Sequence, residues 1–110
     1  MKKILFFLAF IWLSTEAQAQ TIKPCEIFGT VCFVQDKFQA DFSVYIEETE
    51  SFATVRVFRE DNALYADQTG VWFITNKPAY ADYLVYVETI KGRANFTIYY
   101  TDTKAFAGCN

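Results

Sequence analysis

Alanine recurs along this chain at a nearly constant interval, and that interval constrains the fold more than any other feature. The repeated alanines lie 13 residues apart, with one interval of 15, and they are Ala40, Ala53, Ala66, Ala81, Ala94 and Ala107. A polar residue or glycine follows each of them, namely Asp41, Thr54, Asp67, Asp82, Asn95 and Gly108. A short run rich in Val, Ile, Phe and Tyr precedes each alanine, as is typical of β-strands separated by turns. The sequence therefore predicts an all-β domain.

Two neighbouring positions in the repeat differ in character. Nine residues before each alanine stand Val31, Val44, Val57, Trp72, Val85 and Ile98. The following position is aromatic except at Cys32, and its members are Cys32, Tyr45, Phe58, Phe73, Tyr86 and Tyr99. Successive residues of a strand point to opposite faces, so we expect the first set to fill a packed interior and the second to face the other way.

The alanine and the residue after it suggest a turn. The small side chain at every repeat predicts that another chain segment crosses close to it. Asp, Asn and Thr bond readily to their own backbone at the start of a turn, and Gly permits one. We therefore expect the residues after the alanines to act in turns, and a calcium site formed by several aspartates is the alternative.

The sequence also contains a longer repeat, with a period of 41 residues. When residues 29–69 are placed over 70–110, nine of the 41 positions are identical. The sequence thus predicts two copies of a three-strand unit, related by pseudo-twofold symmetry. In such an arrangement the end of the second copy lies near the start of the first, which predicts a disulfide between Cys25 and Cys109. Pairing of Cys25 with Cys32 is the alternative; otherwise Cys32 is a buried filler.

Residues 1–19 have the features of a secretory signal peptide. Two lysines precede an apolar run over residues 4–13, and Ala17-Gln18-Ala19 fits a cleavage site. The run is shorter than the roughly 20 apolar residues that span a membrane. We therefore expect export to the periplasm or the medium, an oxidising environment for the cysteines, and one folded domain over residues 20–110.

The composition excludes several classes of function. The chain has no histidine, which removes histidine-based catalysis and metal ligation. Its formal net charge is −3 and it has no basic run, so nucleic acid is not an expected partner. We expect no metal and no cofactor.

A few charged and aromatic residues offer alternatives. Glu47, Glu48 and Glu88 are candidates for a glycosidase-like carboxylate pair, although solvated strand ends explain them as well. The candidates for binding an anion are Arg56, Arg59 and Arg93. Arg59 occupies an otherwise apolar position, which favours an edge-strand charge or a partner for a carboxylate. The aromatic candidates for stacking on a sugar or peptide include Trp72, Tyr80, Tyr99 and Tyr100, with core packing as the default.

Taken together, these residues resemble the septoil-knot domain family of small bacterial domains. The resemblance rests on the opening Cys25-Glu26-Ile27-Phe28-Gly29, the repeated Ala-Asp turns, the central Gly70-Val71-Trp72-Phe73 and the final Ala107-Gly108-Cys109. Departures are Thr54 and Asn95 in place of aspartate, and Cys32 in place of an aromatic residue. The resemblance implies interwound strands tied in a seven-crossing torus knot. It brings no established activity, and therefore no site residues.

These observations predict an exported, non-enzymatic domain that serves as a very stable structural or binding module, with a protein or a glycan outside the cytoplasm as a possible partner. A carboxylate-dependent hydrolase and a secreted inhibitor of another protein are the alternatives.

Overall fold

The structure is a computed structural model, and it describes residues 22–110. The signal peptide expected over residues 1–19 lies outside the described residues. Within the described part, no helix is long and apolar enough to cross a membrane.

The described chain consists of short strands alternating with single turns of 3-10 helix. The strands are β1 (Gly29–Phe33), β2 (Phe42–Ile46), β3 (Val55–Arg59), β4 (Val71–Ile74), β5 (Tyr83–Val87), β6 (Phe96–Tyr100) and β7 (Gly108–Cys109). The 3-10 helices are η3 (Pro24–Glu26), η4 (Lys37–Gln39), η5 (Glu50–Phe52), η6 (Ala63–Tyr65), η7 (Pro78–Tyr80), η8 (Lys91–Arg93) and η9 (Lys104–Phe106). The all-β prediction is confirmed, and β1 to β6 lie in the six runs that precede the repeated alanines.

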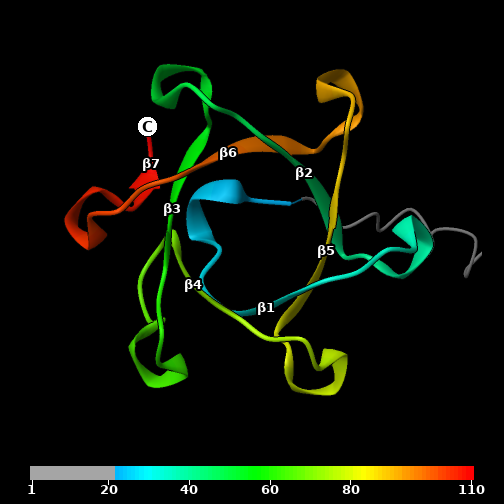
Figure 1. Cartoon of the computed structure of the whole chain (residues 1–110), viewed down its shortest axis with the longest axis horizontal. Coiled ribbons are helices and arrows are strands. Elements are labelled where there is room, and N and C mark those ends of the chain that lie inside the picture. Colours follow the sequence, from blue (N-terminus) through cyan, green and yellow to red (C-terminus); the bar gives the residue numbers. More distant parts are fainter. Residues whose placement is uncertain (1–21) are drawn as a thin grey trace, which may run out of the picture.

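The first six strands form a closed parallel barrel. The sheet order is β4-β1-β5-β2-β6-β3-β7, and β3 also pairs with β4, which closes the ring. Strand β7 adds to β3 in the antiparallel sense. Strands from the two halves of the chain alternate around the barrel (Figure 1). The pseudo-twofold relation between the halves stays a prediction.

The barrel interior is built from the position nine residues before each alanine. All six of these side chains have no solvent exposure: Val31, Val44, Val57, Trp72, Val85 and Ile98. Phe42, Val55 and Phe96 form a further buried group two residues nearer the strand starts. The strands are parallel, so equal positions lie at similar heights and their side chains meet in layers. The expectation of a packed interior at this position is confirmed.

Connections between strands of one half cross a strand of the other half. The segment 34–41 links β1 to β2, and β5 lies between these strands in the sheet. The main-chain N–H of Asp41 donates to the carbonyl of Leu84 at 2.6 Å. The same bond recurs from Asp82 to Thr30 at 2.8 Å and from Asn95 to Ser43 at 2.9 Å. Because the interior is filled, these crossings run over the outer face of the barrel, and their turns project outward in Figure 1.

The repeated alanines end the 3-10 helices of these connections. Each alanine donates its N–H to the carbonyl three residues earlier, and all six follow this pattern: Ala40, Ala53, Ala66, Ala81, Ala94 and Ala107. Two helices begin with a side-chain cap, because Asp36 accepts from the N–H of Phe38 and Asn62 from that of Leu64. The chain therefore leaves each strand, makes one tight turn and reaches the alanine as it meets the neighbouring strand.

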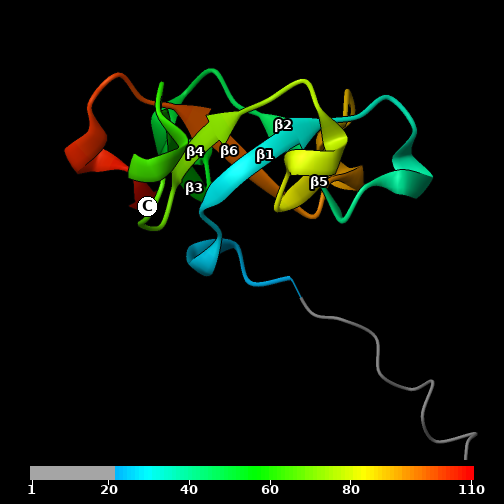
Figure 2. The same ribbon diagram turned by 90° about the horizontal axis from the view of Figure 1, so that it is seen from below.

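The two ends of the described chain are joined by the predicted disulfide. Cys25 and Cys109 are bonded, with their Cα atoms 5.4 Å apart and a sequence separation of 84. Cys32 is a free, buried cysteine. The Cys25–Cys109 pairing is confirmed, and the alternative pairing with Cys32 is wrong. Figure 2 shows η3 on one side of the ring of strands, below the barrel in that view.

Candidate functional site

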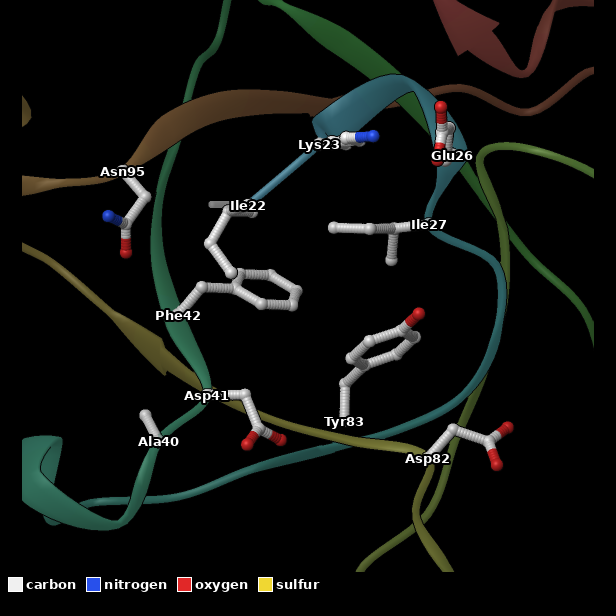
Figure 3. A pocket seen from close by; sticks show the side chains of 10 residues that line it. All are labelled: Ile22, Lys23, Glu26, Ile27, Ala40, Asp41, Phe42, Asp82, Tyr83 and Asn95. Carbon is white, nitrogen blue, oxygen red and sulfur yellow. The ribbon is translucent and has the colours of Figure 1, made fainter. Parts of the chain in front are cut away.

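A cavity of about 720 Å³ opens at the end of the barrel where the strands begin. Its lining comes from the N-terminal segment and from three crossings: Ile22, Lys23, Glu26, Ile27, Ala40, Asp41, Phe42, Asp82, Tyr83 and Asn95. Figure 3 shows the apolar side chains near the middle of this space and the polar groups of Asp41, Asp82 and Asn95 around its rim. Such a hollow, with an apolar floor and a few polar groups, is the usual form of a small-ligand site.

Aromatic and aliphatic side chains make the floor. Phe42 begins β2 and Tyr83 begins β5, and their ring centroids are 5.7 Å apart in an edge-to-face arrangement. Phe42 also packs against Phe96 at 5.3 Å and against Trp72 at 6.5 Å. Ile27 is buried beside them. The floor is therefore continuous with the barrel core and has little freedom to move.

The polar rim comes from the residues that follow the repeated alanines. The Asp41 carboxylate accepts a hydrogen bond from the N–H of Leu84 at 2.8 Å. Asp82 accepts from the N–H of Thr30 at 2.9 Å, and the Asn95 amide oxygen accepts from the N–H of Ser43 at 2.7 Å. These bonds reach the strand being crossed, so the expectation that these side chains bond to their own backbone is wrong for the three rim residues.

Each rim residue is anchored by one atom, and its other polar atom stays available. In the part of the chain that the structure describes, the second carboxylate oxygens of Asp41 and Asp82 and the amide nitrogen of Asn95 have no hydrogen-bond partner. Lys23 and Glu26 add one ammonium and one carboxylate to the same lining. The cavity thus offers acceptors and donors that are already oriented.

The remaining residues after the alanines serve elsewhere. Thr54 donates its N–H to the hydroxyl of Thr97 at 3.0 Å. Gly108 begins β7 with a φ of +119°, a conformation that glycine adopts without strain. Asp67 is exposed at the join between the two halves and does not line the cavity. The rim therefore uses only part of the repeated set.

The glutamates considered for hydrolysis lie at the opposite end of the barrel. Glu47 and Glu88 are buried where β2 and β5 finish, and Glu48 is exposed. Lys91 forms an ion pair with Glu47, and Lys37 forms one with Glu88. None of the three glutamates lines the cavity. Each buried carboxylate is neutralised by its own lysine, an arrangement that suits structure better than a glycosidase pair.

Ion pairs at the strand ends are a regular device that the sequence reasoning missed. A third pair joins Lys104 to Glu60 at 2.9 Å. In all three pairs the glutamate stands six residues before a repeated alanine and the lysine three residues before another. We call these three pairs the Lys–Glu clasps. Comparison of every repeat position, including the polar ones, would have revealed them.

One glutamate and one tyrosine at this end have shifted pKa values. The pKa of Glu60 is lowered, chiefly by the side-chain hydrogen bond from Lys104. Burial raises the pKa of Tyr100, and the nearby Arg59 guanidinium opposes part of that rise. Arg59 lies over the Tyr100 ring, 4.1 Å from its centroid. Arg59 is therefore a cation–π partner on a strand paired at both sides, and the expectation of an edge-strand charge is wrong.

The other sequence candidates are dispersed. Arg56 pairs with Glu50 at 3.1 Å, and Arg93 is exposed in η8. Trp72 has no solvent exposure, so it offers no stacking surface. The exposed large apolar side chains lie mainly at the turns, including Phe38 at 98% and Leu64 at 80% exposure.

The calcium alternative requires several carboxylates to converge. Among residues 22–110, no group of three or more His, Cys, Asp and Glu side chains is arranged to hold a metal ion. Two of the three aspartates after the alanines, Asp41 and Asp82, instead bond to main-chain N–H groups on neighbouring strands.

The barrel, the disulfide and the repeated turns agree with the comparison against known families. The chain matches the 7(1) septoil knot domain family over residues 24–110, and it belongs to that family. No curated protein and no solved structure matches it significantly.

Proposed function

We propose that this chain is an exported, non-enzymatic module that binds a small ligand through its barrel cavity and persists outside the cytoplasm because it unfolds very slowly. The observation that carries this proposal is the alternation of strands from the two halves around one closed, disulfide-joined barrel. The disulfide also supports an oxidising location.

The alternation links every strand to the other half of the chain. Strand β1 lies between β4 and β5, and β2 lies between β5 and β6. No strand can leave the barrel without releasing two neighbours and the connection that crosses it. We infer that these crossings wind the chain into the seven-crossing torus knot for which its family is named.

Slow unfolding follows from this architecture. A barrel that opens only as a whole exposes few segments that a protease can cleave. Its survival outside the cell therefore depends on how slowly the whole barrel unfolds. The disulfide closes most of the described chain, which removes much of the freedom of the unfolded state. We therefore expect the folded protein to resist proteases.

Binding, in preference to catalysis, is supported by the distribution of charged groups. The buried glutamates are held in ion pairs away from the cavity. Two of the three cavity carboxylates, those of Asp41 and Asp82, are each tied to a main-chain N–H. Such groups are well placed to hold a ligand.

Proteolysis tests the proposal. The oxidised protein should survive prolonged digestion by a broad-specificity protease such as proteinase K, while Cys25→Ala/Cys109→Ala should be cleaved much sooner. Cys32→Ala is the matched control, because it removes a thiol without opening the ring, and it should behave nearly like the parent chain. Rapid digestion of the oxidised parent would contradict a role based on persistence.

A further inference from the structure

We propose that the cavity at the strand-start end binds a short saccharide of one or two sugar rings. This inference rests on the proposed binding role and names the chemical class of the ligand. Its support is the combination of anchored polar groups and an apolar floor around one space of about 720 Å³.

The polar groups around the cavity are suited to hydrogen bonds with the hydroxyl groups of a ligand. A hydroxyl both donates and accepts hydrogen bonds. The free carboxylate oxygens of Asp41 and Asp82 are acceptors, while the Asn95 amide nitrogen and the Lys23 ammonium are donors. The Tyr83 hydroxyl can do both, and Figure 3 shows it within the space between Ile27 and Asp82. A ring of hydroxyls satisfies both kinds of group at once.

A simple cation fits this lining less well. An amine or guanidinium would bind the carboxylates of Asp41, Asp82 and Glu26, but it has no acceptor for the donors Lys23 and Asn95. Lys23 also offsets one of these three negative charges. The mixed donors and acceptors therefore favour a polyhydroxylated, nearly neutral molecule.

The anchoring of the rim reduces the entropic cost of binding. The Asp82 side chain is fixed by the N–H of Thr30, and the Asp41 side chain by the N–H of Leu84. Side chains held before the ligand arrives lose little freedom on binding. The free oxygens therefore present a preset pattern of acceptors.

The floor suits the apolar face of a sugar ring. Phe42, Tyr83 and Ile27 supply an apolar surface at the centre of the cavity. A pyranose has C–H groups on its faces and hydroxyls around its edge. The placement of apolar groups centrally and polar groups peripherally matches that distribution.

The chain itself suggests a variant that separates binding from folding. Asn95 anchors to a main-chain N–H through its amide oxygen in the same way that the aspartates use a carboxylate oxygen. Asp41→Asn/Asp82→Asn therefore keeps both anchoring bonds and converts the two free acceptors into donors. Asp67→Asn is the matched control, because it makes the same change at an equivalent position outside the cavity.

Binding is measured with N,N′-diacetylchitobiose, cellobiose and maltose as probes, and with N-acetyl-lysine amide as a cationic comparison. In the exported chain, from which the expected signal peptide over residues 1–19 has been removed, Trp72 is the remaining tryptophan. It packs 6.5 Å from Phe42 of the floor, so its fluorescence should report occupancy. Isothermal titration calorimetry checks the same affinities without relying on fluorescence.

At least one saccharide should bind, Asp41→Asn/Asp82→Asn should weaken it by roughly tenfold to a hundredfold, and Asp67→Asn should leave it unchanged. All three chains should melt at similar temperatures. Binding of the lysine amide alone, no saccharide binding, or saccharide binding insensitive to the double variant would overturn the inference.

The outcomes also distinguish this inference from the proposed function. A protease-resistant chain that binds none of the saccharides loses only the ligand class. A chain that binds a saccharide and cleaves it, as chromatography of the products would reveal, keeps the ligand class and loses the non-enzymatic role.

Discussion

The two ends of the barrel use the same repeated turns for opposite purposes. Where the strands begin, Asp41, Asp82 and Asn95 reach main-chain N–H groups on neighbouring strands and surround a cavity. Where the strands finish, the Lys–Glu clasps neutralise buried carboxylates and Arg59 covers the ring of Tyr100. The first end leaves polar atoms available, whereas the second end satisfies its charges internally.

This difference shows how a repeat can separate stability from binding. A carboxylate that is tied to one N–H keeps a second oxygen for a ligand, and its bond still holds the crossing in place. A carboxylate paired with a lysine is occupied by that partner. Under our proposal, ligand binding belongs to the strand-start end, and the strand-finish end fastens the crossings.

The covalent closure should give the largest effect at the strand-start end. Cys25→Ala/Cys109→Ala should lower the free energy of unfolding by about 4–5 kcal/mol, because the disulfide closes a long loop in the unfolded chain. Chemical denaturation measures the loss. If Cys32→Ala costs as much, the disulfide has no special part in holding this end together.

A glycine at the start of β4 should show how tightly this end is packed. Gly70 has a φ of +84°, and an added Cβ would lie 2.3 Å from the nitrogen of Gly108 and 2.7 Å from the carbonyl oxygen of Arg56. Gly70→Ala should cost about 3 kcal/mol or more, because both strain and a backbone clash result.

Gly92→Ala is the control for this substitution. Gly92 lies in η8, and an added Cβ would meet nothing within 4 Å. Thermal unfolding should show a change within about 1 kcal/mol, in either direction. Equal losses at the two glycines would mean that close packing around Gly70 is not the cause.

Breaking a clasp should test the fastening role of the strand-finish end. Lys91→Met leaves Glu47 buried without its cation, and it should cost about 1–3 kcal/mol of unfolding free energy, less than a fully buried pair because Lys91 is half exposed. Lys77→Met is the control, because Lys77 lies in a corresponding crossing and has no ion-pair partner within the described chain. A larger loss of unfolding free energy for Lys77→Met than for Lys91→Met would show that the Lys–Glu clasps do not fasten the strand-finish end.

Acid should loosen the third clasp in a predictable direction. The pKa of Glu60 is lowered in the folded state, chiefly by the hydrogen bond from Lys104. Its contribution to stability is therefore present above the pKa of the unfolded chain and is lost as the pH falls through the lower, folded value.

Lys104→Met should consequently flatten the loss of stability below about pH 4, near the ordinary pKa of glutamate. Urea denaturation at a series of pH values gives this slope for the variant and for the parent chain. An unchanged slope would indicate that Lys104 does not set the acid sensitivity of Glu60. This is the smallest of the expected effects, because both side chains are partly solvated.

Much of the fold could be predicted because its repeat is visible in one sequence. The spacing of the alanines gave the strands, and the aliphatic position gave the interior, since side-chain direction follows from strand geometry alone. The 41-residue repeat also led to the Cys25–Cys109 pairing. These features depend on local sequence and on one symmetry argument.

The site could not be predicted in the same way, because it depends on which strands become neighbours. Asp82 appears in the sequence as a turn residue, but its partner is Thr30, 52 positions away. Asp41 and Asp82 meet the cavity only because the crossings bring them to one end of the barrel. Arg59 was misassigned for the same reason, since closure of β3 on β4 removes the edge that it was expected to protect.

The alternation of strands also determines when order can appear along the chain. None of β1, β2 and β3 pairs with another of the three. A polypeptide that ends before residue 71 therefore has no sheet partner for any of its strands, and it should remain as pliable as an unfolded peptide. We therefore expect the barrel to form only when the second half of the chain is present, so that the first half could pass lengthwise through a narrow channel before it folds.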